Sequence, residues 1–284
     1  FLDWDMYFLS LMAGPAPAAA SDPHAFDLAL STLTEVTQTR SAYGHVMNKR
    51  AARGSSSSDT NSRSEPYVGS MVVDRIYQDA QGTERAPTVQ WVATLLFPTL
   101  LRWNQWVWET RRYNVGKVGK RKNGGDSGSG GGSGSGSGGG GWISPPGGLV
   151  VLGEDDHLPC EGSTIGLNSS RLHCATQGGA ILESGMDNSP MYYNSFADPS
   201  NKKGVAASYD AKAGRLQLYD CQMSALFVSE SKALQRLAVA TGNAAVVPML
   251  KQQSDAMALL INSVLWDEST GIYRQVDASD ANRG

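Results

Sequence analysis

The sequence predicts an all-α fold of the α/α toroid type, in which pairs of helices form a ring and the loops at one end build a pocket. About six or seven segments place apolar residues at the spacing of amphipathic helices. No convincing run alternates between apolar and polar residues as half-buried strands do, and the motif-bearing loops between helices are short. A complete ring of this type needs about twelve helices, so we expect this chain to hold roughly half of one.

The first predicted helix lies at the start of the chain, with Trp4 and Asp5 in its first turn. Apolar residues follow at helical spacing, and an aspartate near a helix N-terminus is favoured by the helix dipole. A second, scaffold helix begins at residues 21–23, Ser-Asp-Pro, because proline is favoured in a first turn, and it continues to Val36. The chain opens at Phe1 without methionine, as though entered within a helix, so we interpret it as a fragment.

Four further helical segments are predicted along the rest of the chain. Residues 68–79 form a short amphipathic helix, and residues 91–112 form a longer helical zone that we expect Pro98 to interrupt. Helical stripes then cover residues 216–238 and 249–265, and the second of these ends in a short hairpin. Within the earlier stripe, Asp220 is either a partner of the site residues or a capping or solvated aspartate.

Two low-complexity stretches interrupt this pattern. Residues 53–61 form a polar insertion, and residues 124–141 are almost pure glycine and serine, which gives a random coil with a span of about 25 Å. Because the entropy of loop closure grows slowly with length, we interpret both as loop insertions in one partial domain, residues 1–284. Residues 142–178 are irregular, rich in proline and glycine and without periodicity, so the pattern assigns them no place in the ring.

Composition excludes several classes of function. The net charge is −3 and the pI about 5.8, so the chain has no broad basic face for a nucleic acid. No apolar run reaches the ~18–20 residues of a membrane span. Three cysteines, Cys160, Cys174 and Cys221, fit no metal-ligand spacing, so we expect no metal site and no cofactor. Compartment and oligomeric state stay open.

One stretch, Glu183-Ser184-Gly185-Met186-Asp187-Asn188-Ser189-Pro190-Met191-Tyr192, carries the strongest candidate for chemistry. It places the Asp187 carboxylate two residues after a glycine and three before a proline, in a segment with little helical or strand period. The carboxylate therefore sits on a shaped loop. The alternative is a structural turn in which Asp187 and Asn188 bond the local backbone.

This stretch resembles the acid-bearing loop, Glu-Ser-Gly-x-Asp-(Asn/Asp)-(Ser/Tyr)-Pro, of glycoside hydrolase family 63 and its trehalase-like relatives. These are (α/α)6-barrel enzymes that include processing α-glucosidases and mannosylglycerate hydrolases. Every specified position from Glu183 to Pro190 fits. The resemblance implies that Asp187 is the catalytic general acid. It also implies substrate-binding residues in this loop, namely Glu183, Gly185, Asn188 and Tyr192.

Two other segments carry the same resemblance. Trp4 and Asp5 match a Phe-x-Trp-Asp-x-x-Phe segment, which implies that both line the sugar pocket. Residues 62–70 resemble an Asp-Arg-Ser-Gln-Pro-Pro-x-Gly-Ser loop, with Glu65 in place of a neutral glutamine. Arg63 in this loop could bind a carboxylate, such as a glycerate aglycone, or brace the loop by hydrogen bonds.

The resemblance implies hydrolysis with inversion, which needs a protonated carboxyl group and a second carboxylate ~6.5–9.5 Å away that activates water. Asp187 would be the acid, with its pKa raised by burial or by the negative charges of Glu183 and Asp5. The family's base is a glutamate far beyond the acid loop, and neither Glu230 nor Glu268 stands in a matching context.

Two functions follow from these observations. The first is an inverting α-glycosidase that hydrolyses an α-glucoside or an α-mannoside, with Asp187 as acid and the general base outside this chain. The second is a catalytically inactive sugar-binding fragment or relic. A carbohydrate is the expected partner in both.

Overall fold

A computed structural model describes part of the chain, and every structural statement below concerns that part. The described residues are 3–14, 22–48, 63–113, 148–153, 155, 177–186, 209–210 and 213–278. Both predicted insertions, residues 53–61 and 124–141, lie outside these ranges.

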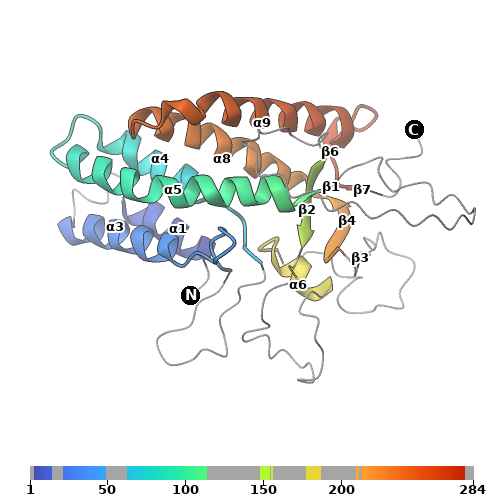
Figure 1. The fold of residues 1–284 in the computed structure, drawn as a ribbon, viewed down its shortest axis with the longest axis horizontal. Coiled ribbons are helices and arrows are strands. Elements are labelled where there is room, and N and C mark those ends of the chain that lie inside the picture. The colour runs from blue at the N-terminus through green and yellow to red at the C-terminus, as the bar shows by residue number, and fades with distance from the viewer. Residues whose placement is uncertain are drawn as a thin grey trace, which may run out of the picture.

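The long helices pack in consecutive pairs (Figure 1). Helix α1 packs on α3, α4 on α5, and α8 on α9, while α4 also contacts both α1 and α8. This pairing confirms the predicted all-α class and leaves an open arc of helix pairs. The α-helices are α1 (Asp3–Ala13), α3 (Pro23–Gln38), α4 (Gly69–Ala80), α5 (Ala86–Thr110), α6 (Gln177–Leu182), α8 (Cys221–Ala240) and α9 (Val247–Leu260).

Helix α3 begins where the sequence predicts. The Asp22 side chain accepts a hydrogen bond of 2.9 Å from the backbone N–H of His24, and Pro23 occupies the first turn. The predicted apolar face is buried, with Leu33 and Val36 each 1% exposed. Local capping and burial therefore agree along this helix.

Helix α5 corrects one prediction. Pro98 lies inside a continuous helix from Ala86 to Thr110, so the expected interruption is wrong. Pro98 sits on the exposed side, whereas Phe97 and Trp103 on the other side are buried in the core. Burial of this apolar face outweighs the cost of about 3 kcal/mol that a proline imposes on a helix interior.

A small antiparallel sheet closes one end of the helix pairs. Its central strands are β2 (Leu149–Gly153) and β4 (Arg215–Tyr219), and β1, β3 and β7 pair along their edges. The edge strands are β1 (Arg112–Tyr113), β3 (Tyr209–Asp210) and β7 (Val276–Asp277). A separate hairpin joins β5 (Trp266–Asp267) to β6 (Ile272–Tyr273), which confirms the hairpin predicted at this point.

The start of the stripe predicted over residues 216–238 is wrong, because residues 215–219 form strand β4. Leu216 and Leu218 are buried on alternate positions, which is the two-residue period of a strand. Helix α8 begins after Asp220, whose carboxylate accepts 2.8 Å from the N–H of Met223. Asp220 is thus the capping aspartate of the alternatives considered, and it also accepts from Gln275 Nε2 at 3.0 Å.

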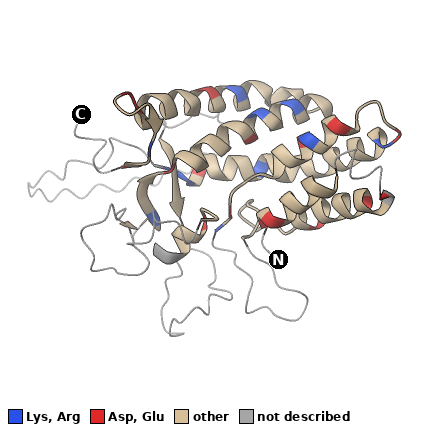
Figure 2. Ribbon diagram, turned by 180° about the vertical axis from the view of Figure 1, so that it is seen from behind, with Lys and Arg blue, Asp and Glu red and all other residues tan. Residues whose placement is uncertain are grey.

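Most aromatic side chains that the structure describes serve the core. Trp103 stacks on Tyr7 with ring centres 6.0 Å apart, and Trp108 stacks on Phe227 at 5.4 Å. Along the described helices, basic and acidic residues are interspersed among the others (Figure 2). None of the described helices is long and apolar enough to cross a membrane.

Candidate functional site

The predicted site segments meet at one end of the helix pairs. The N–H of Asp3, at the start of α1, donates 3.1 Å to the carbonyl of Asn48, and the N–H of Asn48 donates 3.2 Å to the carbonyl of Arg63. The next residue, Ser64, reaches both Asp3 and Glu183 with hydrogen bonds of 3.4 Å. Four segments that are separate in the sequence are therefore tied together at this end.

Gly185 brings the motif loop against the other two predicted segments. A Cβ atom added there would lie 2.8 Å from Pro66 Cγ and 3.4 Å from Trp4 Cε2, and φ is +65°. Only glycine combines that backbone angle with this close approach at little cost. The Trp4 ring is partly exposed beside this contact and packs edge-to-face on Phe8, with ring centres 5.7 Å apart. It therefore offers a plane on which a sugar ring can stack.

The carboxylate of Glu183 is buried and fully engaged. Arg111 Nε lies 2.8 Å from both of its oxygens, and the backbone N–H of Gly153 donates 2.7 Å to Oε2. Burial raises the pKa of Glu183, whereas the positive charge of Arg111 and these hydrogen bonds act to lower it. Glu183 serves as an anchor of the loop in this arrangement, and its predicted contact with substrate stays a prediction.

Arg111 extends the anchor into a buried ion network. Its Nη1 lies 2.8 Å from Asp155 Oδ1, which also lies 2.8 Å from Arg215 Nη2. Burial acts to raise the pKa of Asp155, but the charges of Arg111 and Arg215 outweigh it and lower the pKa to about 2. The Arg111 guanidinium also lies over the ring of Trp106, 4.2 Å from its centre.

Sequence reasoning missed three members of this network, Arg111, Asp155 and Arg215. They lie on separate elements, and no spacing along the chain links them. Asp155 also falls within residues 142–178, where the sequence offers no periodicity. The sequence did offer one signal for this region. The apolar run of residues 149–152, which includes two β-branched valines, is typical of a buried strand.

A pair of buried carboxyl groups, Asp3 and Glu65, lies beside the network. Asp3 and Glu65 are 0% and 5% exposed. Burial, then the negative charge of Glu65 and a hydrogen bond with its side chain, raise the pKa of Asp3 well above its ordinary value. The extra carboxyl group that the sequence indicated at Glu65 is therefore directed at Asp3, a residue that sequence reasoning did not select.

The remaining predicted residues have different outcomes. Asp5 is exposed on α1, and Arg63 is buried with 7% of its surface accessible. The carbonyl of Arg63 also accepts the hydrogen bond from the N–H of Asn48 described above. The roles expected for the other three residues are not tested, since these positions lie outside the described ranges. They are Asp187, Asn188 and Tyr192.

The two glutamates beyond the motif, Glu230 and Glu268, both accept hydrogen bonds from other residues. Glu230 Oε2 and Oε1 accept 2.8 and 2.7 Å hydrogen bonds from the backbone N–H groups of Ser70 and Met71 at the start of α4. Burial raises the pKa of Glu230 to about 7. Glu268 accepts a hydrogen bond of 2.6 Å from Trp266 Nε1 at the exposed hairpin. Glu230 therefore joins α8 to the start of α4, and Glu268 braces the hairpin.

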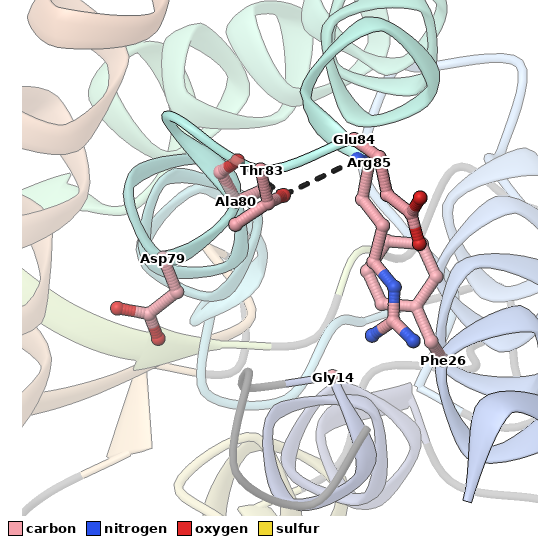
Figure 3. A pocket seen from close by; sticks show the side chains of 7 residues that line it. All are labelled: Gly14, Phe26, Asp79, Ala80, Thr83, Glu84 and Arg85. Carbon is pink, nitrogen blue, oxygen red and sulfur yellow. Dashed lines mark hydrogen bonds between the residues drawn. The ribbon is translucent and has the colours of Figure 1, made fainter. Parts of the chain in front are cut away.

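A hollow of about 250 Å³ lies at the opposite end of the helices (Figure 3). The Arg85 guanidinium lies 4.4 Å from the ring centre of Phe26 there, and the wall includes Gly14 at the end of α1. No predicted site residue lines it, so it is separate from the candidate site. Within the described ranges, no three histidine, cysteine or acidic side chains gather in a way that could hold a metal ion.

Comparison with known proteins identifies relatives. The model of one family, the mannosylglycerate hydrolase MGH1-like glycoside hydrolase domain, matches residues 16–283. No curated protein sequence matches the chain.

Solved structures share the fold. One is a GH63 mannosylglycerate hydrolase from Thermus thermophilus in complex with Tris, with TM-score 0.58 and 16% identity over 99% of this chain and 62% of that one. A second structure of a GH63 mannosylglycerate hydrolase from this organism, with Tris and D-glycerate, has TM-score 0.56 and 15% identity over 98% of this chain and 61% of that one. A third, with glucose, has TM-score 0.55 and 16% identity over 97% of this chain and 59% of that one. The likeness confirms an incomplete α/α toroid, and the chain spans about three fifths of the length of these structures.

Proposed function

Because the chain belongs to the mannosylglycerate hydrolase MGH1-like glycoside hydrolase domain family, we propose that the protein is an inverting α-glycosidase. Its substrate is an α-glucoside or an α-mannoside. The observation that carries the proposal is the family match over residues 16–283. The contact of Gly185 with Pro66 and Trp4 supports it, because the three segments of the resemblance converge there.

In this proposal Asp187 is the general acid that protonates the leaving oxygen, and the general base lies outside this chain. Asp187 follows Met186, the last described residue of the motif loop. The charge of Glu183 is balanced by Arg111, so Glu183 contributes little to raising the pKa of Asp187. Of the two carboxylates expected to raise the pKa of Asp187, this leaves Asp5.

The substrate class within the proposal follows from the relatives. The solved structures with the same fold include GH63 mannosylglycerate hydrolase structures in complex with D-glycerate and with glucose. We therefore place mannosylglycerate first, with N-glycan-type α-glucosides as the second class to test. Trp4 would stack on the sugar ring, and Arg63 would pair with the glycerate carboxylate or brace its loop.

The test begins with the native product. Its intact mass shows whether the native protein is longer than this sequence. The additional residues would supply the general base. The purified product is then screened on mannosylglycerate, α-mannosides and α-glucosides. Asp187→Asn should lower kcat at least about 100-fold, because the general acid is lost. Asp255→Asn, an exposed aspartate paired with Lys251, is the matched control. Full rate in Asp187→Asn would contradict the proposal.

The alternative, a sugar-binding protein without turnover, is favoured by one observation. Within the described residues, the glutamates that follow the motif loop, Glu230 and Glu268, are held in local structural contacts. This alternative predicts saturable sugar binding by calorimetry with no hydrolysis, and a weaker affinity in Trp4→Ala. Measured turnover that depends on Asp187 would exclude it.

A further inference from the structure

A buried ion network joins four segments directly beside the motif loop. Arg111 follows α5, Asp155 follows β2, Glu183 follows α6, and Arg215 begins β4. The side chains of Arg111, Asp155 and Glu183 are 1%, 2% and 2% exposed. Charges this deeply buried are tolerated only when they are paired in good geometry, so the network fixes these segments relative to one another.

The Arg111 guanidinium is held on three sides. It bonds both oxygens of Glu183 through Nε, bonds Asp155 through Nη1, and lies over the indole of Trp106. Burial acts to lower the pKa of Arg111, but the charges of Glu183 and Asp155 outweigh it and raise that pKa. Arg111 is therefore a fixed cation whose planar donor group sets the orientation of the Glu183 carboxylate.

Glu183 in turn fixes the start of the motif loop. The N–H of Gly185 donates 3.3 Å to the carbonyl of Leu182, and the N–H of Met186 donates 2.9 Å to Ser184 Oγ. Gly185 then meets Pro66, as described above. The turn from Glu183 to Met186 is thus held at both ends.

We propose that Arg111 is a positioning residue for the glycosidase reaction, acting through Glu183 on the loop that carries Asp187. The inference rests on the proposed role of Asp187 as general acid. Asp187 is four residues beyond Glu183, a distance that limits its reach to about 14 Å from the anchor. Proton donation requires placement of the acid to within a fraction of an ångström, so loosening the anchor should slow the chemical step more than it weakens binding.

The test uses the full native protein and three single variants. Arg111→Met keeps an unbranched side chain beside Trp106 but removes the charge and the donors. Arg111→Lys keeps the charge, but its single terminal nitrogen cannot bond Glu183, Asp155 and the Gly153 carbonyl together as the three guanidinium nitrogens do. Arg215→Met is the matched control, because it removes the other cation on Asp155 Oδ1 without removing any bond to Glu183.

Two readouts are measured on each variant. The first is kcat and KM on the substrate that the screen identifies. We expect kcat to fall at least about tenfold in Arg111→Met with KM changed less than about threefold, no rescue by Arg111→Lys, and a smaller loss of kcat in Arg215→Met than in Arg111→Met. The second is hydrogen exchange at the amides of residues 183–186, compared with α9. Exchange should rise at residues 183–186 alone in Arg111→Met.

Each outcome decides the matter. Equal losses of kcat in Arg111→Met and Arg215→Met would reduce the network to a structural role and overturn the proposal. Unchanged exchange at residues 183–186 in Arg111→Met would overturn it as well. If the wild type shows no turnover, or Asp187→Asn keeps full rate, the proposed function fails, while the exchange measurement still decides whether Arg111 holds the loop.

Discussion

At the scale of single residues, the site end of the molecule concentrates buried acids. The side chains of Asp3 and Glu65 interact directly, and Ser64 donates hydrogen bonds to both Asp3 and Glu183. Burial raises the pKa of both Asp3 and Glu183. At Asp3 the negative charge of Glu65 raises the pKa further, whereas at Glu183 the positive charge of Arg111 acts to lower it.

This difference predicts a pH effect on stability. A carboxyl group whose pKa is raised in the folded state binds more protons there than in the unfolded chain. The free energy of unfolding therefore falls as pH rises above the ordinary value of 3.8 for Asp3. In Glu65→Gln, the amide donates a hydrogen bond to Asp3 and removes the like charge. We expect this variant to gain about 1 kcal/mol over wild type at pH 8, and less at pH 5.

Urea unfolding at pH 5 and pH 8 measures this gain. Glu84→Gln, near the opposite end of the helices, is the control and should change stability by less than about 0.5 kcal/mol at both pH values. A Glu65→Gln variant that loses stability at pH 8 would show that the carboxyl pair is not the source of the effect.

Residue identities explain why the sequence could select only part of the site. The resemblance selected Trp4 and Gly185 and marked Glu65 as a departure from its pattern, and the structure places all three at one end of the helix pairs. Arg111 and Asp155 carry no local signal, because an ion pair between residues on different elements leaves no periodic trace in the sequence. Their roles emerge only once the fold brings them together.

At the scale of elements, helix α4 depends on a residue of another helix. Its N-cap, Val68, makes no side-chain capping bond, and Glu230 of α8 accepts hydrogen bonds from Ser70 and Met71 instead. A carboxylate at a helix N-terminus satisfies free N–H groups and is favoured by the helix dipole. This contact joins α8 to the start of α4, which directly follows the loop of residues 63–68 at the site.

Glu230→Gln should therefore destabilise the protein. The amide retains one acceptor oxygen, so one of the two N–H groups would face an NH₂ group and lose its bond, at a cost of about 1–3 kcal/mol above pH 7. Because burial raises the pKa of Glu230 to about 7, the wild type loses stability as pH rises from the ordinary value of 4.5 toward 7. The variant should lack this slope.

Thermal unfolding at pH 5 and pH 8 gives the measurement. Glu268→Gln, on the exposed hairpin, is the matched control, and we expect this variant to keep the wild-type change in stability between pH 5 and pH 8. An unchanged pH slope in Glu230→Gln would show that a group other than Glu230 causes the pH dependence.

The elements also show where helical periodicity succeeds and fails. Asp22 and Pro23 mark the start of α3, and local capping predicts it correctly. Strand β4 is five residues long, and Leu216 and Tyr219 within it also fit a helical spacing, so the sequence favoured the wrong period. Only the pairing of β4 with β2 decides the conformation, and that pairing is long-range.

At the scale of the whole molecule, the helix pairs form an open arc of an α/α toroid, and the sequence predicted that architecture from repeated amphipathic segments. What periodicity could not predict is how the chain passes from α5 to the sheet. Strand β1 follows α5 at once and pairs with β2 in register Tyr113 with Leu149. The two ends of the connection that contains residues 124–141 are therefore adjacent.

This adjacency predicts that the Gly/Ser-rich stretch is dispensable for folding. Deleting residues 124–141 roughly halves the connection between β1 and β2, and each halving of a flexible loop returns about 0.6 kcal/mol of closure entropy. The deletion should therefore raise the free energy of unfolding by about that amount, leave α5 paired with the sheet, and keep any turnover of the native protein within about twofold.

The control deletes residues 149–153 instead. This removes β2 and with it the Gly153 bond to Glu183, so this end of the molecule should unfold. Circular dichroism, urea unfolding and the substrate screen measure all three effects. Two independent unfolding transitions, or a loss of cooperativity in the first deletion, would mean that residues 124–141 separate two domains, because a loop inserted within one domain leaves a single transition.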